Sequence, residues 1–194
     1  MPRLSPMPDA GQVREEERDP QQEARRLAAL AQIRQYPDPV LRMQAPEVED
    51  FDDDLARLVE RMKALMGDAS GLGLAAPQVG ILRRVFVFQL DEDEVVAAVN
   101  PVIVERSDET DVDEEGCLSI QGVRVPVERS VAVTLEARNE SGEEVRLALE
   151  ELQARVAQHE LDHLDGTLIL ERTDEESRRK AMAILRRGPV LTEA

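Results

Sequence analysis

The chain has few of the residues that small proteins use for covalent or aromatic reinforcement. Its 194 residues include one cysteine, no tryptophan, one tyrosine and three phenylalanines. One cysteine cannot form a disulfide within the chain, so nothing in the sequence requires an oxidising compartment. Aliphatic side chains must build the core, and a hydrophobic content of 42% is sufficient for one domain.

Basic residues are outnumbered by acidic ones. Lys and Arg number 24 against 41 Asp and Glu, which gives a formal net charge of −17. This charge repels nucleic acids and anionic membrane surfaces where no local basic patch exists, and we find no such patch. No apolar run is long enough to span a bilayer, and no N-terminal segment has the pattern of a secretory signal. We therefore expect a cytoplasmic protein with no nucleic-acid motif and no membrane association.

The sequence predicts three parts: a mobile polar extension over residues 1–32 with a short helix near its end, a folded domain over residues 33–187, and a short tail over residues 188–194. Apolar periodicity and β-branched runs predict helices over 51–67, 150–164 and 174–187, and strands over 84–90, 95–104, 123–127, 131–137 and 145–149. The glycine-rich segment 71–80 is expected to be irregular. This order is typical of an α+β domain with mainly antiparallel β-sheets.

Both histidines lie in the short segment QHELDH at residues 158–163. In a helix, His159 and His163 project from one face and can bind one metal ion. Glu160 would then lie beside the ion and could accept a proton from water that the metal activates. Three protein ligands leave a position for water, which is typical of catalytic rather than structural sites. The segment therefore indicates a metal-dependent hydrolase.

The histidine motif alone does not identify the third ligand. Ile169 stands where the metzincin pattern has its third histidine, which excludes the metzincin class of metal sites. A thermolysin-like site would use a downstream glutamate, and the spacing allows Glu175 or Glu176. Cys117, in the segment EGCLS, is the stronger candidate, because we expect this segment to lie between strands where a thiolate can reach the helix. A nucleophilic Cys117 is a further alternative, but it would leave one histidine and Glu160 without a role.

Three segments of the chain together resemble a known family. Gly71–Gln78, Glu115–Ser119 and Gln158–His163 are similar to the three signature motifs of peptide deformylases, in the same order. The similarity extends over about residues 33–187 and leaves the N-terminal extension unexplained. It implies removal of the formyl group from the N-terminal methionine of newly made proteins, which gives formate and a free amine.

The resemblance also implies roles for individual residues. The metal ligands would be Cys117, His159 and His163. The metal would be Fe²⁺, with zinc, nickel and cobalt able to occupy the same site. Glu160 would be the general acid and base, while the Gln78 side-chain amide and the Leu118 backbone N–H would stabilise the oxyanion. The implied fold places the metal-binding helix centrally among antiparallel sheets, with one helix before the sheets and one at the C-terminus.

Substrate contacts follow from the same resemblance. The backbone at Gly71 and Gly73 would pair with an extended peptide, and Arg124 would meet the peptide backbone. Leu152 and Val156 would line an apolar pocket for the methionine side chain. Each residue also has an ordinary interpretation: turn glycines, a surface arginine and helix packing.

Two other functions remain as alternatives. A thermolysin-like metallo-endopeptidase would depend on Glu175 or Glu176, rather than on Cys117, to retain its metal. A non-enzymatic metal-binding or peptide-binding module would bind metal without turnover. For the deformylase hypothesis, the expected partners are N-formyl-Met peptides of nascent chains. Ribosome association is compatible with that substrate, and we expect a monomer.

Overall fold

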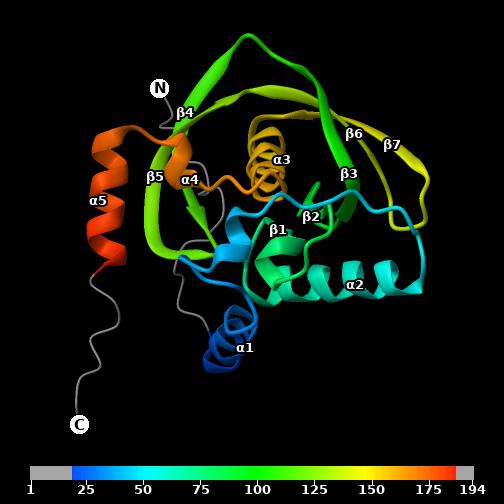
Figure 1. Cartoon of the computed structure of the whole chain (residues 1–194), viewed down its shortest axis with the longest axis horizontal. Helices are drawn as coiled ribbons and strands as arrows, with labels where there is room; N and C mark the ends of the chain where they lie inside the picture. The colour runs from blue at the N-terminus through cyan, green and yellow to red at the C-terminus, as the bar shows by residue number, and fades with distance from the viewer. Residues whose placement is uncertain (1–18, 187–194) are drawn as a thin grey trace.

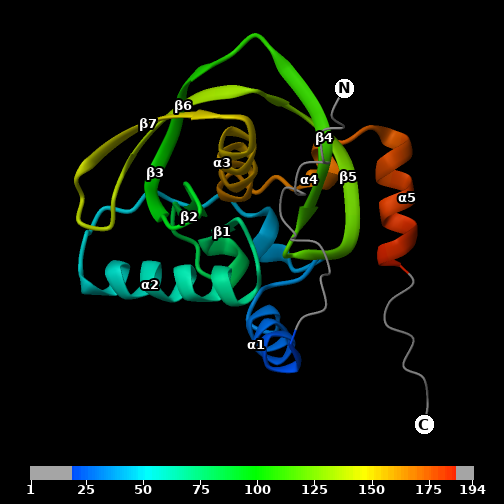
Figure 2. The same cartoon turned by 180° about the vertical axis from the view of Figure 1, so that it is seen from behind.

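Two antiparallel β-sheets surround one helix in the computed structural model, which describes residues 19–186. One sheet has five strands in the order β1-β2-β3-β6-β7, and the other consists of β4 and β5. Figure 1 shows α3 enclosed between the sheets, and Figure 2 shows the same arrangement from behind. Helix α2 packs on β1 and β2, and α5 packs on β5. The expected α+β class is confirmed.

The elements have the following bounds. The strands are β1 Gly73–Ala75, β2 Val85–Gln89, β3 Val95–Arg106, β4 Thr110–Cys117, β5 Ile120–Ser130, β6 Ala132–Arg138 and β7 Glu144–Glu150. The helices are α1 Pro20–Leu30, α2 Asp53–Asp68, α3 Glu151–Leu164, α4 Ile169–Arg172 and α5 Glu175–Leu185, with the 3-10 turns η1 Pro39–Arg42 and η2 Ala76–Val79. All of the helices and strands predicted from the sequence have counterparts here. Most of the expected extension and the whole expected tail lie outside the described residues.

Helix α3 occupies the centre because its side chains are small or apolar where it meets the larger sheet. Ala154 and Ala157 belong to the same buried cluster as Phe86, Phe88 and Leu135 of the sheet. The two alanines let the helix approach the strands closely, since no longer side chain separates them. Every residue from 154 to 164 except His159 is buried, so the polar residues of α3 are carried into the interior with the apolar ones.

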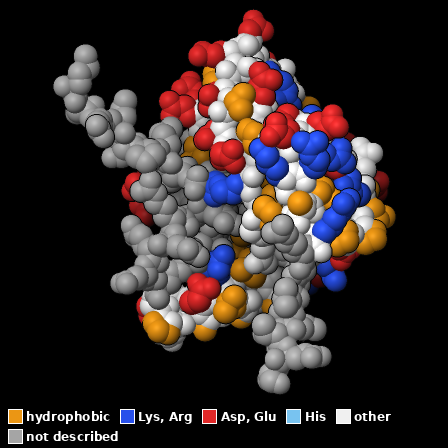
Figure 3. Space-filling model, turned by 90° about the vertical axis from the view of Figure 1, so that its left-hand side faces the viewer, with side chains coloured by type: hydrophobic (Ala, Val, Ile, Leu, Met, Phe, Trp, Pro, Cys, Tyr) orange, Lys and Arg blue, Asp and Glu red, His pale blue; other side chains and the backbone are white. Residues whose placement is uncertain are grey.

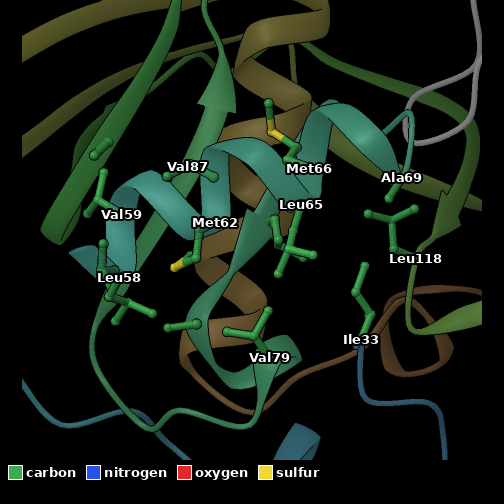
Figure 4. Packing of buried hydrophobic residues seen from close by; sticks show 14 of the residues in the cluster. Ile33, Leu58, Val59, Met62, Leu65, Met66, Ala69, Val79, Val87 and Leu118 are labelled. Carbon is green, nitrogen blue, oxygen red and sulfur yellow. The ribbon is translucent and has the colours of Figure 1, made fainter. Parts of the chain in front are cut away.

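A second core lies on the other face of β1 and β2. Helix α2 presents buried residues with helical spacing, and Figure 4 shows Val59, Met62 and Met66 among them, on the face turned toward the strands. Leu118, which follows the last residue of β4, packs in this same cluster. The core under α2 therefore reaches the segment that carries the cysteine.

Core packing begins before the boundary that the sequence suggested. Helix α1 starts at an Asp19 cap and ends at Leu30, and Ala29 and Leu30 are buried together with Ile33 in the core under α2. The segment is polar overall, but its last turn carries apolar side chains, and these are enough to dock it. Residues 20–30 therefore form a short helix near the end of the expected extension, and the last turn of this helix packs against the folded domain.

Strand β4 was not predicted, and its discovery corrects the expected setting of Cys117. The strand carries four acidic residues, Asp111, Asp113, Glu114 and Glu115, so it lacks the apolar alternation that identifies a strand in a sequence. It is stabilised by antiparallel pairing with β5 along its length. Cys117 is therefore the end of a strand, beside a register shift between Gly116 and Cys117, and not part of a loop between strands.

The segment 71–80 also contains more regular structure than expected. Gly73–Ala75 forms the edge strand β1, and Ala76–Val79 forms the 3-10 turn η2. Both pieces are too short to produce a periodic pattern in the sequence.

The surface mixes charges of both signs. On the face shown in Figure 3, acidic and basic side chains lie beside one another and beside hydrophobic ones. Within residues 19–186, no helix combines the length and apolar character that crossing a membrane requires.

Helix α2 begins with a side-chain cap whose strength depends on pH. Asp52 Oδ1 accepts a hydrogen bond of 2.9 Å from the backbone N–H of Leu55. This bond lowers the pKa of Asp52 below its usual value of 3.8. A carboxyl group whose pKa is lower in the folded protein stabilises the fold fully above its unfolded pKa, and this stabilisation is lost as pH falls through the folded pKa.

We predict that Asp52→Ala lowers the Tm by a few degrees at neutral pH, because an N–H group of the first turn loses its acceptor. The Tm difference from the unchanged protein should shrink as the pH falls below about 4, the pKa of an aspartate without such a bond, and the carboxylate becomes protonated. Asp52→Asn, which keeps a neutral cap, is the matched control and should resemble the unchanged protein at neutral pH. Thermal unfolding, monitored by circular dichroism, gives the Tm of the unchanged protein and of both variants. A Tm difference between Asp52→Ala and the unchanged protein that does not vary with pH would contradict the charged cap.

Candidate metal centre and active site

Three metal-binding side chains converge from two elements. Cys117 comes from the end of β4, and His159 and His163 come from successive turns of α3. One ligand atom from each residue lies within 4.8 Å of the other two. The Cys117 Sγ and His163 Nε2 atoms are 3.3 Å apart, and the two imidazole rings have centroids 5.0 Å apart. The helical spacing of the histidines thus produces the geometry that the sequence suggested.

These donors fit a divalent transition metal. One sulfur and two imidazole nitrogens are ligands of catalytic metal sites, in which three protein groups leave a coordination position for water or substrate. Cys117 and His163 are each 2% exposed, so the site is screened from bulk solvent. We therefore regard Cys117, His159 and His163 as a candidate metal centre.

Glu115 orients His159. Its Oε2 atom lies 3.0 Å from His159 Nδ1, and Glu115 is 1% exposed. A carboxylate on Nδ1 favours the tautomer that leaves Nε2 free for a metal. Burial opposes ionisation of Glu115, but hydrogen bonds from His159 and Arg129 outweigh it and hold the pKa of this carboxyl well below its usual range.

The two imidazoles differ in their environments. Burial lowers the pKa of each ring. For His159, interactions with Cys117 and Glu115 outweigh burial and raise the pKa well above its usual value. For His163, burial and the neighbouring His159 lower the pKa well below that value. His163 Nδ1 has no hydrogen-bond partner among the described residues.

Two arginines and two acids join the ligands to the fold. Arg129 donates to both oxygens of Glu115, from Nε at 2.9 Å and from Nη2 at 3.0 Å. Its Nη1 donates to Asp162 Oδ2 at 2.6 Å. Asp162 immediately precedes His163 and also accepts hydrogen bonds from Arg172. Arg129 therefore links the acid behind His159 to the acid beside His163.

Sequence reasoning assigned no role to Arg129, although a signal was present. In β5 the buried positions alternate through Val123, Val125 and Val127, and Arg129 continues this series. An arginine at an inward position of a strand requires a buried acid nearby. Glu115, with which it pairs, has two interpretations from the sequence: an acid that orients other groups of the site, such as an arginine, or a solvent-facing acid in an acidic run.

Gln78 is held beside the cysteine. Its Oε1 accepts a hydrogen bond of 2.8 Å from the Ala75 N–H, which fixes the orientation of the amide. Its Nε2 donates to Ser119 Oγ at 3.1 Å and lies 3.7 Å from Cys117 Sγ. The amide N–H groups therefore face the metal centre. The backbone N–H of Ser119 lies 3.4 Å from the Cys117 sulfur.

Glu160 is buried beside the ligands without a partner of its own. Its Oε2 makes no hydrogen bond to any described residue, and burial raises the pKa of this carboxyl to about 7. A Cβ atom added to Gly73 would overlap the Glu160 carboxyl group. The carboxyl group can lie against β1 because residue 73 has no side chain.

A pocket opens beside this centre. Its lining consists of Leu72, Gly73, Gln78, Glu115, Gly116, Cys117, Leu118, Arg155, Val156, His159 and Glu160. Of the substrate-binding residues predicted from the sequence, Gly73 and Val156 belong to this lining. Leu72 and Arg155 join it without having been predicted.

Three predicted substrate-binding residues lie outside the lining. Gly71 is buried next to it, where an added Cβ would approach the Leu118 side chain. Arg124 lies in β5 and donates to the Glu114 carbonyl at 3.3 Å. Leu152 is half-buried against the cluster between α3 and the larger sheet.

Comparison with known sequences identifies the family. The sequence model of the polypeptide deformylase family matches residues 30–179. The chain belongs to this family. A peptide deformylase of Natranaerobius thermophilus is 46% identical over 147 residues, which are 76% of this chain and 94% of that protein. Peptide deformylase 1 of Corynebacterium glutamicum is 43% identical over 161 residues, which are 81% and 95% of the two chains.

Solved structures of peptide deformylases have the same fold. The crystal structure of the Thermotoga maritima peptide deformylase superposes with a TM-score of 0.71 at 47% identity, covering 73% of this chain and 96% of that chain. The Plasmodium falciparum peptide deformylase in complex with an inhibitor gives a TM-score of 0.74 at 37% identity, covering 80% and 97%. As a peptide deformylase, the protein is a hydrolase that removes the N-formyl group from nascent peptides. The endopeptidase and binding-module alternatives are not favoured.

We predict that Gly73→Ala reduces deformylase kcat/KM by about 100-fold, because the new methyl group displaces the Glu160 carboxyl group from its position. Metal content should stay unchanged, since residue 73 is not among the candidate ligands. Formate release and metal per chain measure the two effects.

The matched control is Gly67→Ala in α2, where an added Cβ meets no atom outside the helix within 4 Å. This variant should keep full activity. Equal activity of the two variants would contradict the placement of Glu160 against β1.

Proposed function

We propose that deformylation takes place in the pocket beside Cys117, His159 and His163, with these three residues as ligands of a ferrous ion. The observation that carries the proposal is the convergence of the three ligand atoms within 4.8 Å, next to the unpartnered carboxyl oxygen of Glu160. The substrate is an N-formyl-Met peptide at the start of a nascent protein. The products are formate and a free N-terminal amine.

The identity of the metal rests on the family resemblance and on the chemistry of the donors. A thiolate and two imidazoles suit Fe²⁺, and zinc, nickel and cobalt can occupy the same donor set. When bound, the metal would supply Lewis-acid polarisation of the formyl carbonyl and a lower pKa for water. A thiolate ligand is also sensitive to oxidation, which favours anaerobic preparation of the protein.

Glu160 is proposed as the general acid and base. Its carboxyl group would take a proton from the attacking water and return it to the nitrogen of the departing amine. Its burial and raised pKa of about 7 support this role, because a proton-transfer group works best with a pKa near the working pH. The contact of Gly73 with Glu160 would hold this group in place.

Gln78 and Leu118 are proposed as the oxyanion donors. Gln78 Nε2 is directed toward the centre by the bond between Oε1 and the Ala75 N–H. The Leu118 backbone N–H, at the residue after the cysteine, would be the second donor. Removing one donor of this kind typically raises the barrier by about 3 kcal/mol.

The proposed peptide path runs along β1. This strand is at the edge of the five-stranded sheet, so its outer backbone groups can pair with an extended chain. Gly71 and Gly73 would border this path. Val156 would form part of the methionine pocket, while Leu152 would support it from behind and Arg124 would act at the rim.

The setting of the enzyme completes the proposal. The catalytic domain would span residues 33–187, with α1 docked against it. We place the protein in the cytoplasm as a monomer that associates with ribosomes, because its substrates are nascent chains and a thiolate ligand suits a reducing compartment. Light scattering and cosedimentation with ribosomes test these points.

The first experiment measures formate release from a formyl-Met peptide by anaerobically purified, iron-loaded protein. We expect Glu160→Ala to retain metal and lose release, because only the proton-transfer group is removed. Cys117→Ala should lose metal, with activity falling in proportion. Absence of release from the folded, metal-loaded unchanged protein would overturn the proposal, as would full metal retention by Cys117→Ala.

A second experiment tests the methionine pocket. Val156→Asp should raise the KM for formyl-Met peptides by about 10-fold or more, because a carboxylate replaces an apolar wall, while metal content survives. Val102→Asp is the control, since Val102 is 53% exposed on β3. Unchanged kinetics in Val156→Asp would remove this residue from the pocket.

A further inference from the structure

Arg155 is a buried arginine in the wall of the active-site pocket. It is 6% exposed and lies in α3, outside the three signature motifs. Arginine side chains are seldom fully buried unless their charge is paired. Its position beside Val156, in a pocket that must accept an apolar side chain, therefore calls for a specific physical role.

The contacts of Arg155 join three elements. Its Nη1 donates to Glu115 Oε1 at 3.0 Å and to the Val127 carbonyl at 2.9 Å. Its Nη2 donates to the Asp111 carbonyl at 3.0 Å and lies 3.6 Å from Asp111 Oδ2. One guanidinium group thus holds α3 against both β4 and β5, and it contacts β4 at two points.

The position of Arg155 relative to His159 gives these contacts a consequence for the metal centre. The two residues are one helical turn apart, so their side chains project from the same face of α3. Glu115 faces both of them: Oε1 accepts from Arg155, and Oε2 lies 3.0 Å from His159 Nδ1. Arg155 therefore restricts the rotation of the carboxylate that orients the His159 ring.

Charge balance alone does not explain Arg155. Arg129 already pairs with both oxygens of Glu115. The other acid near Arg155 is Asp111, whose side chain is 67% exposed. Water therefore solvates the charge of Asp111 well, even if Arg155 is removed. What Arg155 adds is geometry, because its planar group makes hydrogen bonds to fixed backbone carbonyls of β4 and β5.

We propose that Arg155 is a positioning residue for the metal centre. It fixes Glu115, and through Glu115 the His159 ring, and it holds the strand that carries Cys117 against the helix that carries the histidines. This inference rests on the proposed ligand roles of Cys117, His159 and His163.

The test compares Arg155→Leu with the unchanged protein, using Co²⁺ as the probe. Competition with a chromophoric chelator gives the Co²⁺ dissociation constant, and the cobalt–thiolate absorption reports the geometry of the centre. We expect the dissociation constant to rise about 10-fold and the absorption bands to shift, as is typical when a group behind a metal ligand is removed. In the metal-saturated enzyme, kcat should fall more than KM rises.

Arg84→Leu is the matched control. Arg84 is also largely buried and pairs with Asp165 at the end of α3 at 2.7 Å, but it has no contact with Glu115. The Arg84→Leu variant should have a lower Tm and an unchanged Co²⁺ affinity. If Arg155→Leu behaves in the same way, with altered Tm but unchanged affinity and spectrum, Arg155 is only a structural residue and the proposal fails.

Two further variants separate geometry from charge. Arg155→Lys keeps the charge and is expected to fold even where Arg155→Leu does not, yet it should also weaken Co²⁺ binding, because lysine cannot contact both strands in this way. Wild-type affinity in Arg155→Lys would overturn the proposal. In a Glu115→Gln background, Arg155→Leu should weaken Co²⁺ binding by a smaller factor than in the unchanged protein, because the part of its effect that passes through Glu115 is already lost; equal factors in the two backgrounds would also overturn the proposal.

The cobalt readout does not depend on turnover. If the unchanged protein binds Co²⁺ but releases no formate, the proposed function is refuted. The Co²⁺ affinities of the Arg155 variants still decide the role of Arg155 in that case.

Discussion

The buried carboxylate of Glu115 is the group on which the geometry of the candidate metal centre depends. It contacts His159 and two arginines from different elements, Arg129 of β5 and Arg155 of α3. Removing one partner from a buried ion pair typically costs about 3–5 kcal/mol, because the remaining charge is left without compensation. Each partner therefore constrains the others, and the small β4–β5 sheet is fixed against α3 by charge as well as by apolar packing.

This constraint explains how a two-stranded sheet can carry a candidate metal ligand. A hairpin on its own is marginally stable in water, and β4 exposes most of its acidic side chains. The strand becomes buried only at its last three residues, Glu115, Gly116 and Cys117, and Glu115 is the residue to which both Arg129 and Arg155 bind. Beyond them, Leu118 enters the core under α2. The cysteine is thus held between an ion network on one side and an apolar cluster on the other.

What the sequence could predict follows from which interactions are periodic. Helix α2, helix α3 and the valine-rich strands have apolar side chains at regular spacing, and His159 and His163 share a helix, so these features were predictable. Strand β4 has an acidic sequence and owes its structure to pairing with β5, which no local pattern reveals. The pairing of Glu115 with Arg129 and Arg155 joins residues far apart in the chain, and it emerges only when the strands and the helix are assembled.

Within residues 19–186, some buried polar groups of the site have hydrogen-bond partners, and others have none. Gln78, Glu115, Asp162 and Arg155 all have partners, whereas Glu160 Oε2 and His163 Nδ1 have none among the described residues. A buried polar atom without a hydrogen bond typically costs about 1–3 kcal/mol. The surrounding network stabilises the positions of the ligands and leaves the carboxyl group of Glu160 free of competing bonds. The proton transfer proposed for Glu160 would benefit from this arrangement, since no internal hydrogen bond has to be broken first.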